Sequence, residues 1–367
     1  MSVERDIAGF ALPFAAGVMA SAYVSGLPVK AIAFSSSSAS FIATFLAIVL
    51  IHPRRKSLPS AATRGLIAGI ALFCGLLTGL TDNLISLSSL TSPGFIETAA
   101  VNICQNVQTH IDGIPFRHPE TSAMIKALLT GERSGIPSSI TEAFRSSGAS
   151  HILALSGLHL GIIYIIVNKL TSIIGKSPAA SSLRSTIIVT FCGLYTLATG
   201  AAPSTVRALL FITIGETARI TGRYRSIGNT LLVSLMIQTF FSPSSVSTIS
   251  FQLSYAAMAG IAFIFPGLRK FWTKGSHGLL HRIWDSAAMS ISCQLTTGPL
   301  AYIYFETFPP HFLLTNLIAI PLTGLIIPAS LATLFLSALG ICPQTAVRAT
   351  EALVTALSEA LNIIAMM

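Results

Sequence analysis

The stretch HILALSGLHLG, from His151 to Gly161, opens an apolar run and yet carries two histidines, a serine and two glycines. Polar side chains are costly inside a bilayer, and those found there usually belong to a pathway or a site. Gly157 and Gly161 have the GxxxG spacing that lets a second helix approach closely. His151 and His159 are separated by about 80° around a regular helix. The stretch therefore predicts a membrane span with a polar flank, although hydrogen bonding of each histidine to a neighbouring helix explains it equally well.

The composition extends this interpretation to the whole chain. Of the 367 residues, 52% are hydrophobic and 10% are charged, and the mean hydropathy is +0.74. Soluble domains carry roughly 25% charged residues. The net charge of +9 is expected from the basic cytoplasmic loops of a membrane protein, so it does not by itself indicate nucleic-acid binding. We therefore predict an all-α fold, a polytopic transmembrane helix bundle.

Apolar runs of about 20 residues predict about ten membrane segments, some of them broken or re-entrant. They lie near 7–27, 31–51, 65–90, 150–174, 185–202, 203–218, 227–241, 249–268, 283–305 and 312–340. The first run follows a neutral N-terminal region, so we interpret it as a retained span rather than a signal peptide. The last is too long for one perpendicular crossing of a ~30 Å core. Pro321 and Pro328 are expected to divide it into a re-entrant piece and a helix.

Loop charges predict the orientation. Lysine and arginine gather in every second loop, at 52–64, 175–184, 219–226 and 269–282. The loops at 242–248 and 306–311 contain neither. Basic loops lie in the cytoplasm, so we expect a cytoplasmic N-terminus and residues 91–149 on the outside.

Four regions follow from this topology. Residues 1–90 form the N-terminal transmembrane segments, and residues 91–149 form a short region outside the membrane with amphipathic helices. Residues 150–340 form a transmembrane core, and residues 341–367 form a C-terminal amphipathic helix.

The outer region is expected to hold two helices. Apolar residues at helical spacing predict an amphipathic helix from Pro119 to Gly131. Ser139 with Glu142 three residues later predicts the capped start of a second helix, and Gly148 predicts its end. We interpret Lys126, Arg133 and Arg145 either as interfacial anchors or as a weak electropositive collar for an anionic substrate.

The segment TGAAPSTVR, at 199–207, starts with Thr199 and interrupts the next pair of spans. Gly200 and Pro203 predict a helix break, and Ser204 is expected to cap the span that follows. Arg207 lies one turn into that span. An isolated arginine there needs a partner, a water-filled cavity or an anionic ligand, unless it snorkels to the interface.

Two more polar segments lie in apolar runs. FQLSYAAMAG carries Gln252 and Ser254, and LLTNLIAIPLTGLIIP carries Asn316 and Pro321. Both segments suit helix packing, and both suit a translocation site, because interrupted helices commonly mark such sites.

The sequence contains no motif that indicates metal binding or catalysis. HExxH, HxH and CxxC spacings do not occur, and the five cysteines are scattered. We therefore expect no metal site, no cofactor, no catalytic residue and no enzyme activity.

The four polar segments, in this order, resemble the competence domain of the ComEC family of bacterial inner-membrane DNA-uptake proteins. That family carries LAISGLH, TGASPSxxRA, FQLS and LLANLLAxP segments, and here these stand as HILALSGLHLG, TGAAPSTVRA, FQLSYAAMAG and LLTNLIAIPL. The match runs from about Glu120 to Pro328. The resemblance implies a multi-pass inner-membrane channel that passes single-stranded DNA from the periplasm to the cytoplasm during natural transformation.

The resemblance also implies partners and a pathway. A DNA receptor, a cytoplasmic helicase-like motor and membrane lipids are the expected partners, and self-association of the chain stays open. The polar residues that we expect to line the pathway are His151, Ser156, His159, Thr199, Ser204, Arg207, Gln252, Ser254 and Asn316.

The sequence departs from the family in two places. Many members have an OB-like domain where residues 91–120 stand here, and many end in a metallo-β-lactamase-like domain whose HxHxDH motif is absent from this sequence. A nuclease activity is therefore not carried over. The alternative interpretations are a transporter of a small solute or a lipid-linked anion, and a scaffold subunit of an envelope complex.

Overall fold

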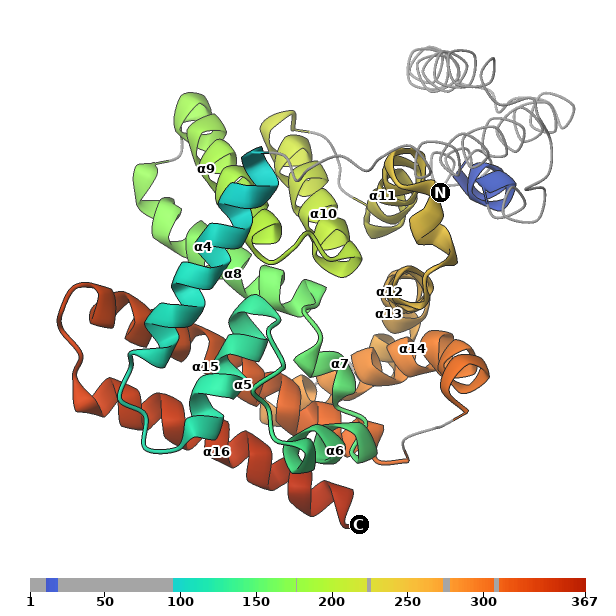
Figure 1. The fold of residues 1–367 in the computed structure, drawn as a ribbon. Coiled ribbons are helices and arrows are strands. Elements are labelled where there is room, and N and C mark those ends of the chain that lie inside the picture. The colour runs from blue at the N-terminus through green and yellow to red at the C-terminus, as the bar shows by residue number, and fades with distance from the viewer. Residues whose placement is uncertain (1–10, 19–94, 176, 223–225, 273–277, 307–309) are drawn as a thin grey trace, which may run out of the picture. The chain divides into compact units, whose positions relative to one another are not determined.

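A computed structural model describes residues 11–18 and 95–367, except 176, 223–225, 273–277 and 307–309 (Figure 1). All regular elements in these ranges are helices, which confirms the all-α prediction for this part of the chain. The predicted spans 31–51 and 65–90 lie outside the described residues, as does most of 7–27.

The described residues form two compact units. The smaller unit contains helical residues 11–18 together with α11 (Ile227–Phe241), η3 (Pro243–Ser247) and α12 (Ile249–Ala259). The larger unit contains α4 (Phe95–Asp112), α5 (Pro119–Thr130), α6 (Ser138–Ser146), α7 (Ser150–Leu153), α8 (Gly157–Leu170), η2 (Thr171–Ile174), α9 (Pro178–Ala198), α10 (Pro203–Ile220), α13 (Phe265–Arg269), η5 (Lys270–Trp272), α14 (Leu279–Phe305), α15 (Phe312–Ala338) and α16 (Gln344–Ala365). A π-helical turn, η4 (Gly260–Ile264), joins α12 to α13.

Three helical segments of the described chain are long and apolar enough to cross a bilayer: Gly157–Ile174, Ile249–Arg269 and Phe312–Ala338. The helix α11 is apolar but shorter. The predicted spans 185–202, 203–218 and 283–305 correspond to α9, α10 and α14, which do not meet the same measure of length and hydropathy. Within the described residues, length and composition therefore support three membrane spans.

The helix α15 runs through Pro321 and Pro328 without interruption, so the predicted division of 312–340 is wrong. A proline removes one backbone hydrogen bond and kinks a helix. Ending the helix there would leave several more backbone groups without partners in apolar surroundings, which costs more.

Residues 95–149 contain both predicted helices and one that was not predicted. The helix α5 confirms the predicted amphipathic helix, and Gly131 follows its end with φ +82°. The helix α6 begins directly after Pro137, with no side-chain cap, so the predicted capping box of Ser139 and Glu142 is wrong. Pro137 fixes its own φ near the start of the helix, and Ser139 therefore falls inside the first turn. The 18-residue helix α4 was not predicted.

An apolar core holds the larger unit together around α5. Met124 and Leu128 of α5 are buried with Ile326 of α15 and Leu357 of α16 in one cluster. Figure 1 shows α15 and α16 side by side, and they make the most extensive contact between any two described helices. The core therefore fixes α5 and α16 against the apolar helix α15.

An ion pair joins α4 to α5 at the surface. The Lys126 ammonium lies 2.8 Å from Asp112, and the Ser122 hydroxyl donates to the same carboxylate over 2.7 Å. The hydrogen bond from Lys126 and, to a smaller extent, the one from Ser122 hold the pKa of Asp112 below its usual value. The Lys126 side chain is therefore engaged in an ion pair within the protein.

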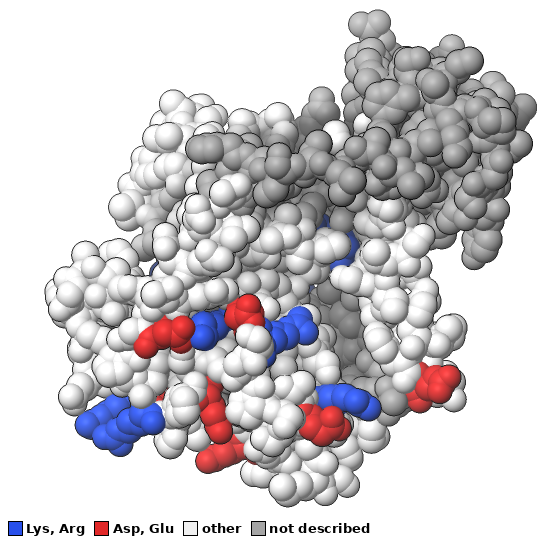
Figure 2. Space-filling view, viewed as in Figure 1, with Lys and Arg blue, Asp and Glu red and all other residues white. Residues whose placement is uncertain are grey.

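Charged and apolar surfaces are separated on the face drawn in Figure 2. Lysine, arginine and acidic side chains gather over α5, α6 and α16, and the surface over α9 is nearly free of charge. Large apolar side chains of α9, among them Leu183, Phe191 and Leu194, are exposed. Such a boundary is typical of a protein that meets both headgroups and hydrocarbon.

Candidate functional site

The stretch from His151 to Gly161 is not one helix. The helix α7 ends at Leu153, Ala154 is extended with ψ 131°, and α8 begins only at Gly157. We call residues 154–156 the α7–α8 link. His151 and His159 lie on different helices, so the predicted common flank of a single helix is wrong.

Ser156 explains why a new helix starts after the link. It is the N-cap of α8, and its hydroxyl accepts a hydrogen bond from the backbone N–H of Leu158 over 3.3 Å. Its own N–H donates to Nδ1 of His159 over 3.2 Å, which completes a capping box with histidine in the place of the usual Glu or Gln. Local side-chain bonds at Ser156 therefore compete with helix continuation and end α7.

His159 is fully buried, at 0% exposure. Because Nδ1 accepts the Ser156 N–H, the neutral ring carries its proton on Nε2. That Nε2 has no hydrogen-bond partner among the described residues. By contrast, His151 is exposed, and its Nδ1 donates to the Gly148 carbonyl over 3.1 Å.

The turn between α9 and α10 has a defined geometry. Gly200 and Ala201 have positive φ values of 77° and 48°. The Gly200 N–H donates to Leu197 over 3.0 Å and the Ala201 N–H donates to Thr196 over 2.8 Å, the two bonds of a Schellman motif. Thr199 is the C-cap of α9.

Ser204 connects this turn to the α7–α8 link. Its hydroxyl donates to the Leu155 carbonyl over 2.6 Å. Ala202, not Ser204, is the N-cap of α10, and Pro203 is the first helical residue. The prediction that Ser204 caps α10 is therefore wrong, because Pro203 starts the helix one residue earlier. Ser204 instead satisfies a carbonyl that the extended link leaves outside any helix.

The two glycines of the GxxxG spacing differ in surroundings. A Cβ built on Gly157 would lie 3.4 Å from the Cβ of Ala208 in α10. A Cβ built on Gly161 would have no described atom within 4 Å. Close approach between α8 and α10 therefore depends on Gly157.

Arg207 shares one face of α10 with Ser204 and Ala208, since residues at i, i+3 and i+4 stack on a helix. That face meets the α7–α8 link and the start of α8. Arg207 is 2% exposed, so its guanidinium lies inside the protein. Snorkelling to the interface requires an exposed guanidinium, and the burial does not support that alternative.

Asn316 lies in the first turns of α15. Its Oδ1 is buried without a hydrogen-bond partner in the described part of the chain. The adjacent Thr315 hydroxyl donates to the Ser147 carbonyl over 2.7 Å and attaches α15 to the turn that precedes α7. Pro321 lies within α15.

Gln252 and Ser254 lie in α12, in the smaller unit. Gln252 Nε2 donates to the Val246 carbonyl over 3.3 Å.

A buried carboxylate was missed by the sequence analysis. Glu216 of α10 is 3% exposed and accepts hydrogen bonds from the Tyr164 hydroxyl over 3.0 Å and the Ser185 hydroxyl over 2.7 Å. It also pairs with Arg219. This cluster joins α8, α9 and α10. An acidic residue inside a predicted span was the available signal.

The charges around Arg207 suit an anion. No group of three or more histidine, cysteine or acidic side chains suited to a metal ion occurs within them. The start of α10 carries a partial positive charge, as does the start of α8. Together with the buried Arg207, these helix ends make a region that suits phosphate or carboxylate groups.

The sequence of the chain matches a known protein family. A family model described as "Competence protein" matches residues 128–367, which include α7, α8, α10, α12 and α15 with all four polar segments. The chain belongs to the competence protein family. The resemblance to the ComEC family is thereby confirmed.

Curated relatives carry related names. ComE operon protein 3 of Bacillus subtilis is 26% identical over 211 residues, which is 57% of this chain and 25% of that protein. Competence protein ComA of Neisseria gonorrhoeae is 24% identical over 210 residues, 54% of this chain and 28% of that protein. The uncharacterized protein YcaI of Escherichia coli is 24% identical over 238 residues, 62% of this chain and 30% of that protein. This member of the competence protein family thus spans less than a third of each relative. No solved structure matches the chain.

Proposed function

We propose that this competence protein forms a path by which single-stranded DNA crosses the bacterial inner membrane into the cytoplasm during natural transformation. The observation that carries the proposal is the contact between the α7–α8 link and α10. There the Ser204–Leu155 hydrogen bond and the Gly157–Ala208 approach place the start of α8 beside the face of α10 that bears Arg207.

The chemistry of a DNA strand fits this arrangement. Each nucleotide carries one phosphate charge that cannot enter lipid unaided. A dense lining of arginine would hold phosphates too tightly for movement, because every neutralised phosphate adds to the affinity. One buried guanidinium next to two helix N-termini attracts a phosphate and still releases it. Arg133 and Arg145, both exposed, act as the collar outside, since Lys126 is paired with Asp112.

The remaining elements of the proposal come from the sequence and the family. The N-terminus and the basic loops lie in the cytoplasm, and residues 91–149 lie in the periplasm. A DNA receptor delivers the strand, and a helicase-like motor draws it in. The proposed path itself involves no catalytic step.

Deletion of the gene tests this function directly. The deletion strain is expected to bind labelled DNA at its surface and to internalise none, and the gene supplied in trans is expected to restore entry. Normal internalisation in the deletion strain would favour the transporter of a small solute or a lipid-linked anion instead.

A further inference from the structure

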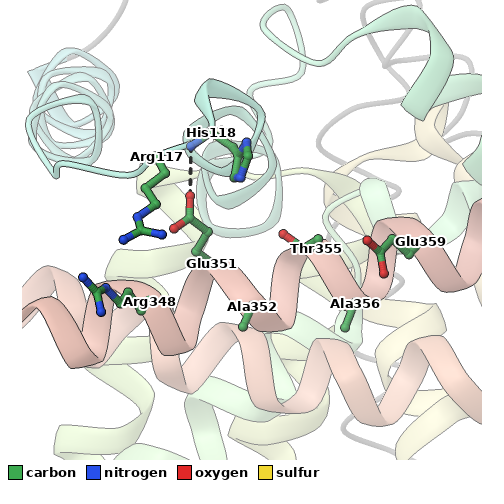
Figure 3. Close-up of a pocket in the computed structure, with 8 residues that line it drawn as sticks. All are labelled: Arg117, His118, Arg348, Glu351, Ala352, Thr355, Ala356 and Glu359. Carbon is green, nitrogen blue, oxygen red and sulfur yellow. Dashed lines mark hydrogen bonds between the residues drawn. The ribbon is translucent and has the colours of Figure 1, made fainter.

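A groove of about 390 Å³ lies between α16 and the residues that lead into α5. Figure 3 shows the side chains that line it along α16. Glu351 is 6% exposed, and its carboxylate accepts the backbone N–H of His118 over 2.9 Å. This bond fixes the Arg117–His118 segment against α16.

Two arginines form one end of the groove. Figure 3 shows Arg117 and Arg348 on the same side of Glu351, with Glu359 at the other end. Neither arginine forms an ion pair with a described residue, and Arg348 has only the neutral Gln344 side chain as a partner, over 3.4 Å. Two guanidinium groups and one carboxylate leave a net charge of +1 at this end.

A phosphodiester carries the single negative charge that would neutralise this end. Guanidinium groups recognise phosphate oxygens through paired hydrogen bonds, and two of them enclose one phosphate well. We propose that the Arg117–Arg348 end of the groove binds the phosphate of an anionic phospholipid headgroup.

The surroundings favour a lipid over a DNA strand. Leu339 and Ile341, in the turn that leads into α16, are 58% and 59% exposed. These exposed apolar side chains stand nine and seven residues before Arg348 in the chain, and exposed apolar residues near a basic cluster suit acyl chains next to a headgroup. A strand would extend past Arg348 toward Glu359, whose carboxylate repels further phosphates. The groove therefore accepts one anionic group and opposes a polyanion.

The test is a titration of phosphatidylglycerol into the full-length, detergent-solubilised protein, with bound lipid counted by native mass spectrometry. Arg117→Gln/Arg348→Gln is expected to weaken the apparent affinity about tenfold, since two charge-assisted contacts are lost. Arg117→Lys/Arg348→Lys is expected to fall in between, because charge remains and the paired geometry is lost. Phosphatidylcholine, which has no net charge, is expected to bind equally weakly to all forms.

A matched control removes two exposed cations elsewhere. Lys169→Gln/Arg282→Gln changes the net charge by the same amount outside the groove and is expected to leave phosphatidylglycerol binding unchanged. Circular dichroism that shows unchanged helix content establishes that each variant is folded. If the glutamine variant does not fold, the lysine variant is compared with the parent protein instead.

Two results would overturn the proposal. In the first, the folded glutamine variant binds phosphatidylglycerol with an affinity within about twofold of that of the parent protein. If only the lysine variant folds, the same result in that variant overturns the proposal. The other is a selective loss of binding to a single-stranded oligonucleotide, which would assign the arginines to DNA. Neither result bears on the path at Arg207, so the two proposals fail separately.

Discussion

At the scale of single residues, the site depends on side chains that bond to backbone groups outside regular helix. Ser156 and His159 hold the backbone at the start of α8. Ser204 bonds the carbonyl of Leu155 from another helix. Polar residues in this apolar chain thus allow the helix to be interrupted between α7 and α8. The interruption lets α10 pack against the α7–α8 link on the face that bears Arg207.

Replacement of Ser204 by alanine tests this role. The change leaves the Leu155 carbonyl without its donor, and a partly buried unsatisfied carbonyl costs about 1–3 kcal/mol. We expect a lower melting temperature in detergent together with reduced DNA entry.

Thr217→Ala in the same helix is the matched control for Ser204→Ala. Its exposed hydroxyl bonds only the Thr213 carbonyl, one turn earlier, and its loss is expected to have little effect. Equal melting temperatures for the two variants would contradict the proposed role of Ser204.

At the scale of helices, the α8–α10 contact rests on one glycine. Gly157→Leu places a large side chain where Ala208 already lies within 3.4 Å of a Cβ, and overpacking of this kind costs about 1–3 kcal/mol. We expect lower membrane abundance or lost DNA entry for this variant. Both are readily measured by immunoblotting and uptake of labelled DNA.

Gly161→Leu provides the comparison, because open space surrounds Gly161 in the described structure. It is expected to be abundant and active. A similar defect in both variants would show that helix propensity or lipid contact, rather than the contact with Ala208, explains the effect.

The sequence predicted helices better than the joints between them. The helix α11 matches the predicted span 227–241 at both ends, because its apolar run has clear limits. The α7–α8 link was missed, since Ala154 and Leu155 continue the apolar run and hydropathy does not report backbone hydrogen bonds. Ser204 was misjudged because its partner lies 49 residues away. Glu216 was overlooked, and its neighbours also come from other helices.

At the scale of the whole molecule, the proposed direction of transport rests on the alternation of loop charge. Reporter fusions after Arg64 and after Glu97 are expected to report the cytoplasm and the periplasm respectively. An alkaline phosphatase and a fluorescent protein, each active on one side only, provide complementary readings. The same compartment at both positions would contradict the topology.

The proposed path predicts separate steps for capture and entry. Surface capture precedes passage through the membrane, so a defect at Arg207 is expected to spare bound DNA and to reduce internalised DNA. Arg207→Lys keeps the charge and loses the paired geometry for phosphate, and we expect it to retain part of the entry.

The most direct measurement is the amount of labelled DNA bound and internalised by cells that carry Arg207→Gln, compared at equal membrane abundance with cells carrying the unaltered protein. The account predicts normal surface binding and loss of most internalised DNA. Normal internalisation by abundant Arg207→Gln protein would contradict the claim that DNA passes this buried arginine.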